Sequence, residues 1–425
     1  MSSMDREIGT GRMPVEAVER WLRRALLCVS LLILCGLAAI AIHLLLQPAP
    51  PLDIYFDLRR QARLVYLACW MCIGLLAGAL ALFRRTQFVS FWVILLIAAE
   101  GGAHAYFHAR NGRLYQPMSR VLLARFEPHP LLVGIPHPGT YGPVSHDADH
   151  RRTTVNEGKA ASPAQIFTFG GSSTYDIGVG DAVTWSSELS RLLGEDFAVE
   201  NLGVPGYSSL ENMIQSLFVF RKAGPSCAIY YVGWNDLRNS HLEGLRDDYS
   251  DFELPSQIGN LAVGHRPGFL ENNVLLLRLV AASIAGKEET GGGAGALGRT
   301  SGEKDPRLSR IFTENMRLIA EIDRHFGVKP VFVPQVLNYA RFTDGWSSGW
   351  IPLVPDRDVK ALMEAMNSDL AEVARQTGTL FLDRPLSLDW QDSDFVDSGH
   401  FSEAGARKFA RAIAGDVAAG CRRGE

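Results

Sequence analysis

The stretch Cys227–Asp236, which reads CAIYYVGWND, decides the fold of this 425-residue chain. Its first six residues, Cys227–Val232, form a strand that is apolar on both faces. Such strands are typical of parallel sheets that are covered by helices on both sides. The polar pair Asn235-Asp236 follows at once, so we expect it at the carboxyl end of the strand, where sheets of this kind place their functional sites.

Strands and helices alternate on either side of this stretch. We expect strands at 165–169, 197–202, 330–336 and 379–382, and helices at 184–194, 210–222, 307–326, 356–377 and 402–418. This alternation predicts an α/β fold with a parallel sheet between two layers of helices. An insertion at 237–306 interrupts it, with one apolar helix candidate near 273–285 and a Gly-rich part at 287–304. We expect the Gly-rich part to be disordered and the rest of the insertion to cap the site.

Uncharged runs near the N-terminus predict membrane helices. Residues 25–46 and 64–83 can each cross roughly 30 Å of hydrocarbon, and a third run at 88–107 contains Glu100 and His104. The expected organisation is therefore a polar tail (1–24), a transmembrane region (25–107), a Pro-, His- and Gly-rich connector (108–164) and an α/β domain (165–421).

The number of spans decides the side of the membrane on which the α/β domain lies. Three arginines between residues 20 and 24 place the N-terminus in the cytoplasm. Three spans would then put the α/β domain outside the cytoplasm, and two would put it inside. Three further arginines between residues 59 and 63 nearly balance the charge, so we expect a multi-pass membrane protein with an extracytoplasmic domain and leave two spans open.

Composition narrows the function classes. The net charge of −4 gives no basic face for nucleic acid, which we exclude as a partner. Four of the six cysteines lie in the apolar runs, and only Cys227 and Cys421 remain for the soluble part. One disulfide is therefore conceivable, but a disulfide framework is not.

Four short polar stretches carry residues that are suited to acyl transfer. Ser172 follows two glycines in Phe169–Thr174 (FGGSST), on a turn that exposes its hydroxyl. Gly206 ends the stretch NLGVPG and offers an unobstructed N–H, and Asn235 offers an amide N–H to an oxyanion. Asp397 precedes His400 by three residues, so its carboxylate can bind Nδ1–H and leave Nε2 free as a base. Taken singly, each stretch is also an ordinary turn or helix cap.

Together, in this order, the four stretches resemble the blocks of the SGNH (GDSL-like) hydrolase family over residues 165–418. The resemblance implies a flavodoxin-like three-layer α/β/α sandwich. It also implies a triad of Ser172, His400 and Asp397, and an oxyanion hole formed by Ser172, Gly206 and Asn235. Gly171 stands where the better-known motif has Asp, which leaves that carboxylate unaccounted for. The Gly-x-Ser-x-Gly elbow of α/β-hydrolases is absent.

We therefore expect a membrane-anchored serine esterase that removes an acyl group, acetyl first of all, from a glycan or lipid near the membrane. The alternatives are an O-acyltransferase that uses the same triad to acylate an envelope glycan, and an inactive scaffold or binding protein. We expect no metal and no organic cofactor. Three further patterns have simpler explanations. Gly293–Gly298 matches a dinucleotide-binding fingerprint but follows no strand, and we expect His146–His150 to be a solvated polar turn and not a metal site. We expect Glu100 and His104 to be interfacial residues at a helix end and not an intramembrane relay.

Overall fold

The computed structural model describes residues 15–46, 54–111, 115, 125–260, 268–284, 300–342 and 351–422. These residues form two compact units. A helical unit contains the N-terminal helices together with residues 268–284, and an α/β unit contains the predicted catalytic domain.

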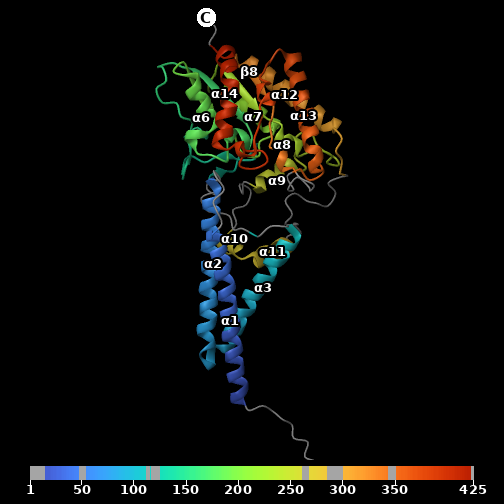
Figure 1. Cartoon of the computed structure of the whole chain (residues 1–425). Coiled ribbons are helices and arrows are strands. Elements are labelled where there is room, and N and C mark those ends of the chain that lie inside the picture. The colour runs from blue at the N-terminus through green and yellow to red at the C-terminus, as the bar shows by residue number, and fades with distance from the viewer. Residues whose placement is uncertain are drawn as a thin grey trace, which may run out of the picture. The chain divides into compact units, whose positions relative to one another are not determined.

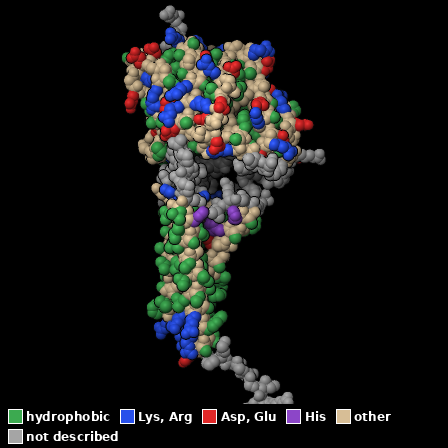
Figure 2. All heavy atoms as spheres, in the orientation of Figure 1, with side chains coloured by type: hydrophobic (Ala, Val, Ile, Leu, Met, Phe, Trp, Pro, Cys, Tyr) green, Lys and Arg blue, Asp and Glu red, His purple; other side chains and the backbone are tan. Residues whose placement is uncertain are grey.

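The helical unit is built from α1 (Val15–Leu46), α2 (Ile54–Ala81), η1 (Arg84–Thr86), α3 (Gln87–Asn111), α10 (Phe269–Asn273) and α11 (Leu275–Ile284). Three of its helices are long and apolar enough to cross a membrane, judged by length and composition. Hydrophobic side chains make up much of their visible surface, and Lys and Arg side chains gather at one end, as Figure 2 shows. The predicted polar tail is wrong for residues 15–24, which continue α1, while residues 1–14 lie outside the described chain.

Five parallel strands form the sheet of the α/β unit. Their order is β6-β5-β7-β8-β9, which is 2-1-3-4-5 in chain order. This is the flavodoxin-like order, so the predicted fold class is confirmed. The strands are β5 (Ala164–Gly170), β6 (Phe197–Asn201), β7 (Cys227–Tyr231), β8 (Lys329–Val333) and β9 (Leu380–Phe381). Strand β8 ends earlier than predicted, where Pro334 removes a backbone donor.

Helices cover both faces of the sheet (Figure 1). On one face, α6 (Trp185–Leu193) and α14 (Glu403–Gly420) pack over an apolar cluster around Trp185 and Phe409. On the other, α7 (Ser209–Phe220), α12 (Pro306–His325) and α13 (Val359–Thr377) pack over Phe169, Tyr230 and Phe332. Strand β7 is buried on both faces, as its composition predicted.

Short elements complete the unit. Helices α5 (Ser172–Tyr175) and α8 (Trp234–Leu237) follow β5 and β7 directly, so they begin at the carboxyl edge of the sheet. The remaining short helices are α9 (Glu253–Asn260), η2 (Asp181–Val183), η3 (Tyr339–Arg341), η4 (Asp356–Asp358), η5 (Arg384–Ser387) and η6 (Asp392–Asp394). Two antiparallel pairs lie in the connector: β1 (Phe126–Glu127) with β2 (Ile135–Pro136), and β3 (Gly139–Tyr141) with β4 (Val144–His146).

The insertion divides between the two units. Helix α9 stays in the α/β unit, but α10 and α11 belong to the helical unit. The prediction that the insertion caps the site therefore stays a prediction for residues 268–284, which pack within the helical unit. Residues 285–299, with the dinucleotide-like stretch, lie outside the described chain. Residues 300–304 are ordered, contrary to the predicted disorder, because Ser301 N–H donates to the Leu353 carbonyl and Lys304 pairs with Asp369.

A disulfide joins Cys227 of β7 to Cys421 after α14, with Cα atoms 5.5 Å apart. It encloses a sequence separation of 194 residues and ties the last helix to the central strand. The other four cysteines are unpaired and lie on the outer surfaces of α1 and α2.

Candidate active site

Ser172 is the first residue of α5, directly after β5. The two glycines before it are required by the close approach of neighbouring backbone and side chains. A Cβ at Gly170, whose φ is +155°, would collide with the Tyr231 carbonyl oxygen, and one at Gly171 would collide with the Asn235 amide nitrogen. The turn therefore brings Ser172 beside the end of β7, and the residue is only 8% exposed.

His400 lies between Ser172 and Asp397 and hydrogen-bonds to both. Its Nε2 is 2.7 Å from the Ser172 hydroxyl oxygen. Its Nδ1 is 2.7 Å from Oδ2 and 2.9 Å from Oδ1 of Asp397. A carboxylate accepts only, so Nδ1 carries the proton and Nε2 is left to accept the hydroxyl proton of Ser172.

The charges in this chain of hydrogen bonds reinforce one another. Desolvation acts to raise the pKa of Asp397, but the charge and hydrogen bond of His400, with two backbone N–H groups, lower it to about 2. Desolvation acts to lower the pKa of His400, but the Asp397 carboxylate outweighs it and the pKa is raised. Asp397 is therefore ionised at neutral pH and stabilises the imidazolium that would form when His400 takes a proton.

The loop that contains His400 is fixed from two sides. The Ser173 hydroxyl donates to the Gly399 carbonyl (2.9 Å), which links the start of α5 to this loop. On the other side, Asn338 N–H donates to the Ser398 carbonyl (2.9 Å). Trp234 is 7% exposed and packs against Gly399 and the ring of Phe342.

The structure also places Gly206 and Asn235 at this edge of the sheet. Asn235 Nδ2 lies next to Gly171 and donates one of its two hydrogens to the Tyr207 carbonyl (2.8 Å). Gly206 has a φ of +87°, and the side chain of Gln257 from α9 lies where its Cβ would be. Both loops are anchored by the buried Asp236, which accepts the N–H and hydroxyl of Ser209.

Asp176 is a buried carboxylate that sequence reasoning missed. It ends α5 in the left-handed region (φ 63°), and its Oδ2 accepts the Trp185 N–H at 2.7 Å. Its Oδ1 has no hydrogen-bond partner among the described residues. Burial raises the pKa of Asp176 to about 7, and its charge contributes to raising that of His400. One indication of it is present in the sequence: Gly171 stands where the better-known motif has Asp, so a carboxylate of this site could be expected at another position.

The metal-like His146–His150 stretch is structural in the part of the chain that the model describes. His146 is 5% exposed, so its interpretation as a solvated turn is wrong. Its Nδ1 bonds to the His137 carbonyl and its Nε2 to the Tyr175 hydroxyl at the end of α5. Burial lowers the pKa of His146 to about 4, so its ring is neutral at pH 7. This neutral ring holds the end of α5 through its hydrogen bond with Tyr175. No group of three metal-ligating side chains occurs among the described residues.

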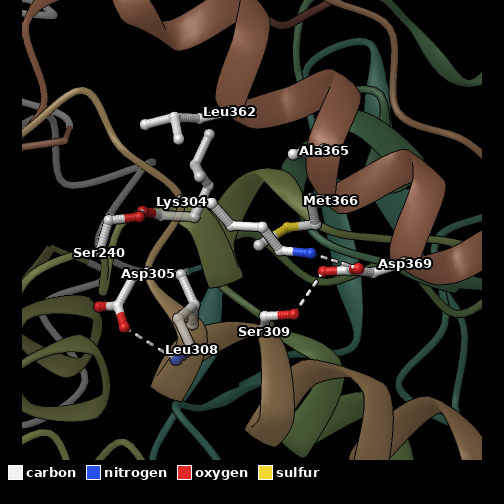
Figure 3. A pocket seen from close by; sticks show the side chains of 10 residues that line it. Ser240, Lys304, Asp305, Leu308, Ser309, Leu362, Ala365, Met366 and Asp369 are labelled. Atoms are coloured by element: carbon white, nitrogen blue, oxygen red, sulfur yellow. Dashed lines mark hydrogen bonds and ion pairs between the residues drawn. The ribbon is translucent and has the colours of Figure 1, made fainter.

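A separate hollow lies between α8, α12 and α13 (Figure 3). Its volume is about 20 Å³, and Leu237, Leu308, Leu362 and Met366 are among its lining residues. An ion pair of Lys304 with Asp369 (2.5 Å) crosses it. The hollow has room for about one water molecule, and neither Ser172 nor His400 lines it.

Comparisons with known proteins show similarity only among solved structures. No family model and no curated protein matches the chain. TesA is 13% identical, with a TM-score of 0.36 over 60% of this chain and 97% of its own. A putative acylhydrolase from Bacteroides fragilis is 11% identical (TM-score 0.36; 62% and 91% covered). The acetylxylan esterase Axe2 from Geobacillus stearothermophilus, as a catalytic mutant, is 12% identical (TM-score 0.34; 61% and 96% covered).

The strand order, read from the structure itself, is the flavodoxin-like order that the sequence analysis expected. Likeness this distant does not establish a reaction, which has to be inferred from the site itself.

Proposed function

We propose that this protein is a membrane-anchored serine esterase of the SGNH type. The observation that carries the proposal is the continuous hydrogen-bonded series Ser172–His400–Asp397 at the carboxyl edge of a parallel sheet. A buried serine hydroxyl that donates to a histidine held by a carboxylate is the arrangement that nucleophilic acyl transfer requires.

In the proposed reaction, Ser172 Oγ attacks the acyl carbonyl carbon while His400 Nε2 takes the hydroxyl proton. The tetrahedral oxyanion receives hydrogen bonds from the N–H groups of Ser172 and Gly206 and from the Asn235 amide. The C–O bond to the alcohol then breaks, and His400 returns the proton to the departing oxygen. Water, deprotonated by His400, attacks the acyl-serine, and the acid leaves with Ser172 restored.

We further propose three membrane spans with the catalytic domain outside the cytoplasm. The salt bridge of Arg84 with Glu19 (2.7 Å) places η1 beside the start of α1. Arg20, Arg23, Arg24, Arg84 and Arg85 therefore share one end of the bundle, and the sequence places Arg59, Arg60, Arg63, Arg110 and Arg113 next to the opposite helix ends. Since these numbers balance, the proposed orientation rests on the three arginines near the start of α1, because the first helix usually decides the orientation. The Cys227–Cys421 disulfide supports an oxidising location for the α/β unit.

The proposed substrate is an acetyl or other short acyl ester on a glycan or lipid at the membrane surface. The membrane anchor supports this choice because it confines the site to the vicinity of the bilayer. Transfer of the acyl group to a sugar hydroxyl would use the same first half-reaction, but no contact in the described residues favours it.

The test compares wild type in detergent with Ser172→Ala and His400→Ala, using p-nitrophenyl acetate hydrolysis and labelling by a fluorophosphonate. Ser387→Ala, on the exposed η5, is the control. We expect both site variants to fall by roughly 10³-fold or more in turnover and the control to match wild type. Wild type that resists the fluorophosphonate would overturn the proposal in favour of the scaffold. Labelling at Ser172 with ester cleavage only when a sugar acceptor is added would identify a transferase.

A further inference from the structure

Helix α11 begins against a carboxylate of the apolar helix α3. Glu100 accepts the Leu275 N–H through Oε1 (2.7 Å) and the Leu276 N–H through Oε2 (2.9 Å). The first N–H groups of a helix have no partner within the helix, and a negative charge there is favourable. Glu100 therefore caps α11 from a residue 175 positions earlier, and its side chain is only 4% exposed.

Other groups of the helical unit complete this junction. The Tyr66 hydroxyl of α2 donates to Glu100 Oε1 (2.8 Å), and His104 lies 3.3 Å from the same oxygen. The Tyr115 hydroxyl donates to the Asn272 carbonyl (2.8 Å) in the last turn of α10, just before the break between α10 and α11. Irregular backbone is tolerated at membrane depth only where protein groups satisfy it in this way.

Glu100 is therefore not an exposed residue at a helix end. Each of its oxygens accepts a backbone N–H group of α11. These two hydrogen bonds hold the start of α11 in position. The sequence-based interpretation of Glu100 as an interfacial residue is wrong for its side chain, which is buried.

The junction lies well inside α3. Glu100 is 13 residues after Gln87 and 11 before Asn111, which places it about 20 Å and about 17 Å from the two ends at 1.5 Å per residue. The hydrocarbon layer is roughly 30 Å thick. If α3 crosses the bilayer, Glu100 and the start of α11 both lie within the hydrocarbon.

Helix α11 is apolar on both of its faces. Leu275, Leu276 and Leu279 pack toward Ala103 and Tyr115. On the outer face Leu277 is 46% exposed and Val280 47%. Arg278 is the only charged residue of α11, and its guanidinium lies 5.8 Å from the centre of the Tyr115 ring. Apart from Arg278, whose charge lies toward the Tyr115 ring, α11 is apolar around its circumference, which suits it to burial or to lipid.

Resting on the membrane anchorage proposed above, we propose that residues 268–284 form a re-entrant helical hairpin in the bilayer. Its inner face is seated on α3, Glu100 clamps its turn, and lipid acyl chains cover its outer face. The insertion of the catalytic domain thus enters the membrane and leaves on the side from which it came. The ten residues of α11 extend about 15 Å, half of the hydrocarbon thickness.

The test measures lipid contact in the full chain reconstituted in nanodiscs. Cys28, Cys35, Cys69 and Cys72 are replaced by alanine and the disulfide is retained. A fluorescent maleimide is then attached at Leu277→Cys, and doxyl-labelled lipids and aqueous iodide serve as quenchers. Two similarly exposed leucines are the controls: Leu96→Cys on α3 (48% exposed) and Leu386→Cys in the α/β unit (49%).

We expect doxyl lipid to quench the labels at 277 and 96 to a similar extent, and at least twofold more than at 386. The hairpin is refuted if only iodide quenches the label at 277, or if neither quencher does because protein covers it. In both cases doxyl quenching at 96 would still show that α3 lies in the membrane. Failure at 96 as well would refute the anchorage, and the hairpin with it. Glu100→Ala should at least halve lipid quenching at 277 and leave it unchanged at 96, whereas equal quenching would refute the clamp.

Discussion

Replacing Asp176 by Asn tests whether the buried carboxyl group that interacts electrostatically with His400 makes the stability depend on pH. Asp176 is fully buried, and burial raises its pKa from an ordinary 3.8 to about 7. The native carboxyl thus keeps its proton to near pH 7, while the unfolded chain releases it near pH 4. Between these values the native state binds more protons, so stability falls as pH rises. At 1.36 kcal/mol per pKa unit, the loss is at most roughly 4 kcal/mol.

Asn at this position removes the ionisation and keeps the local contacts. Its Oδ1 can accept the Trp185 N–H, and Asn tolerates the left-handed backbone found here. The variant should therefore melt higher than wild type at pH 8, by on the order of 10 °C, and the difference should vanish near pH 4. The measurement is thermal unfolding of the full chain in detergent by tryptophan fluorescence from pH 4 to 8.5.

The control is Asp196→Asn, an exposed aspartate in the same unit, which should follow wild type at every pH. A difference for Asp176→Asn that is independent of pH would refute the reasoning, because it would show a packing effect instead of a buried charge. The acidic limb of kcat/KM provides a second readout. Since the Asp176 charge helps to raise the pKa of His400, that limb should move to lower pH in the variant.

Two further predictions concern the turn and the disulfide. Gly171→Ala should retain the fold but reduce turnover on the order of 10²- to 10³-fold, because its Cβ displaces the Asn235 amide. A melting curve checks the fold, and p-nitrophenyl acetate kinetics check the turnover. Turnover equal to that of wild type would contradict this prediction. Cys227→Ala with Cys421→Ala should destabilise the α/β unit by about 2 to 5 kcal/mol, measured by urea unfolding, whereas unchanged urea midpoints would show that the bond contributes little.

The sheet could be predicted from the sequence because its strands carry their own pattern. Cys227–Tyr231 is apolar on both faces, and only a strand covered on both sides buries such a pattern. The positions of Ser172, Gly206 and Asn235 followed from this, since parallel strands gather their carboxyl ends at one edge. The ends of the elements depended on local chemistry, such as Pro334 after β8.

Asp176 and Glu100 could not be predicted in the same way, because their partners are remote or are backbone groups. Asp176 depends on the N–H of Trp185 and on burial beneath His400, and no spacing in the sequence encodes either. Glu100 depends on the N–H groups of Leu275 and Leu276. A pattern of side-chain types says nothing about a backbone donor 175 residues away.

The proposed hairpin and the proposed orientation constrain each other. Helices α10 and α11 leave and rejoin the sequence of the α/β unit, so their ends must lie on one side of the bilayer. Helix α11 is too short to cross, and the clamp at Glu100 is nearer to Asn111 than to Gln87. The hairpin therefore enters from the side of Asn111, opposite the five arginines. Labelling from each side of the membrane could find Arg84 and the catalytic domain on the same side. The hairpin would then have to enter the bilayer from the side of Gln87, which is farther from Glu100 than Asn111 is. In that case the proposed hairpin and the proposed orientation would both be refuted.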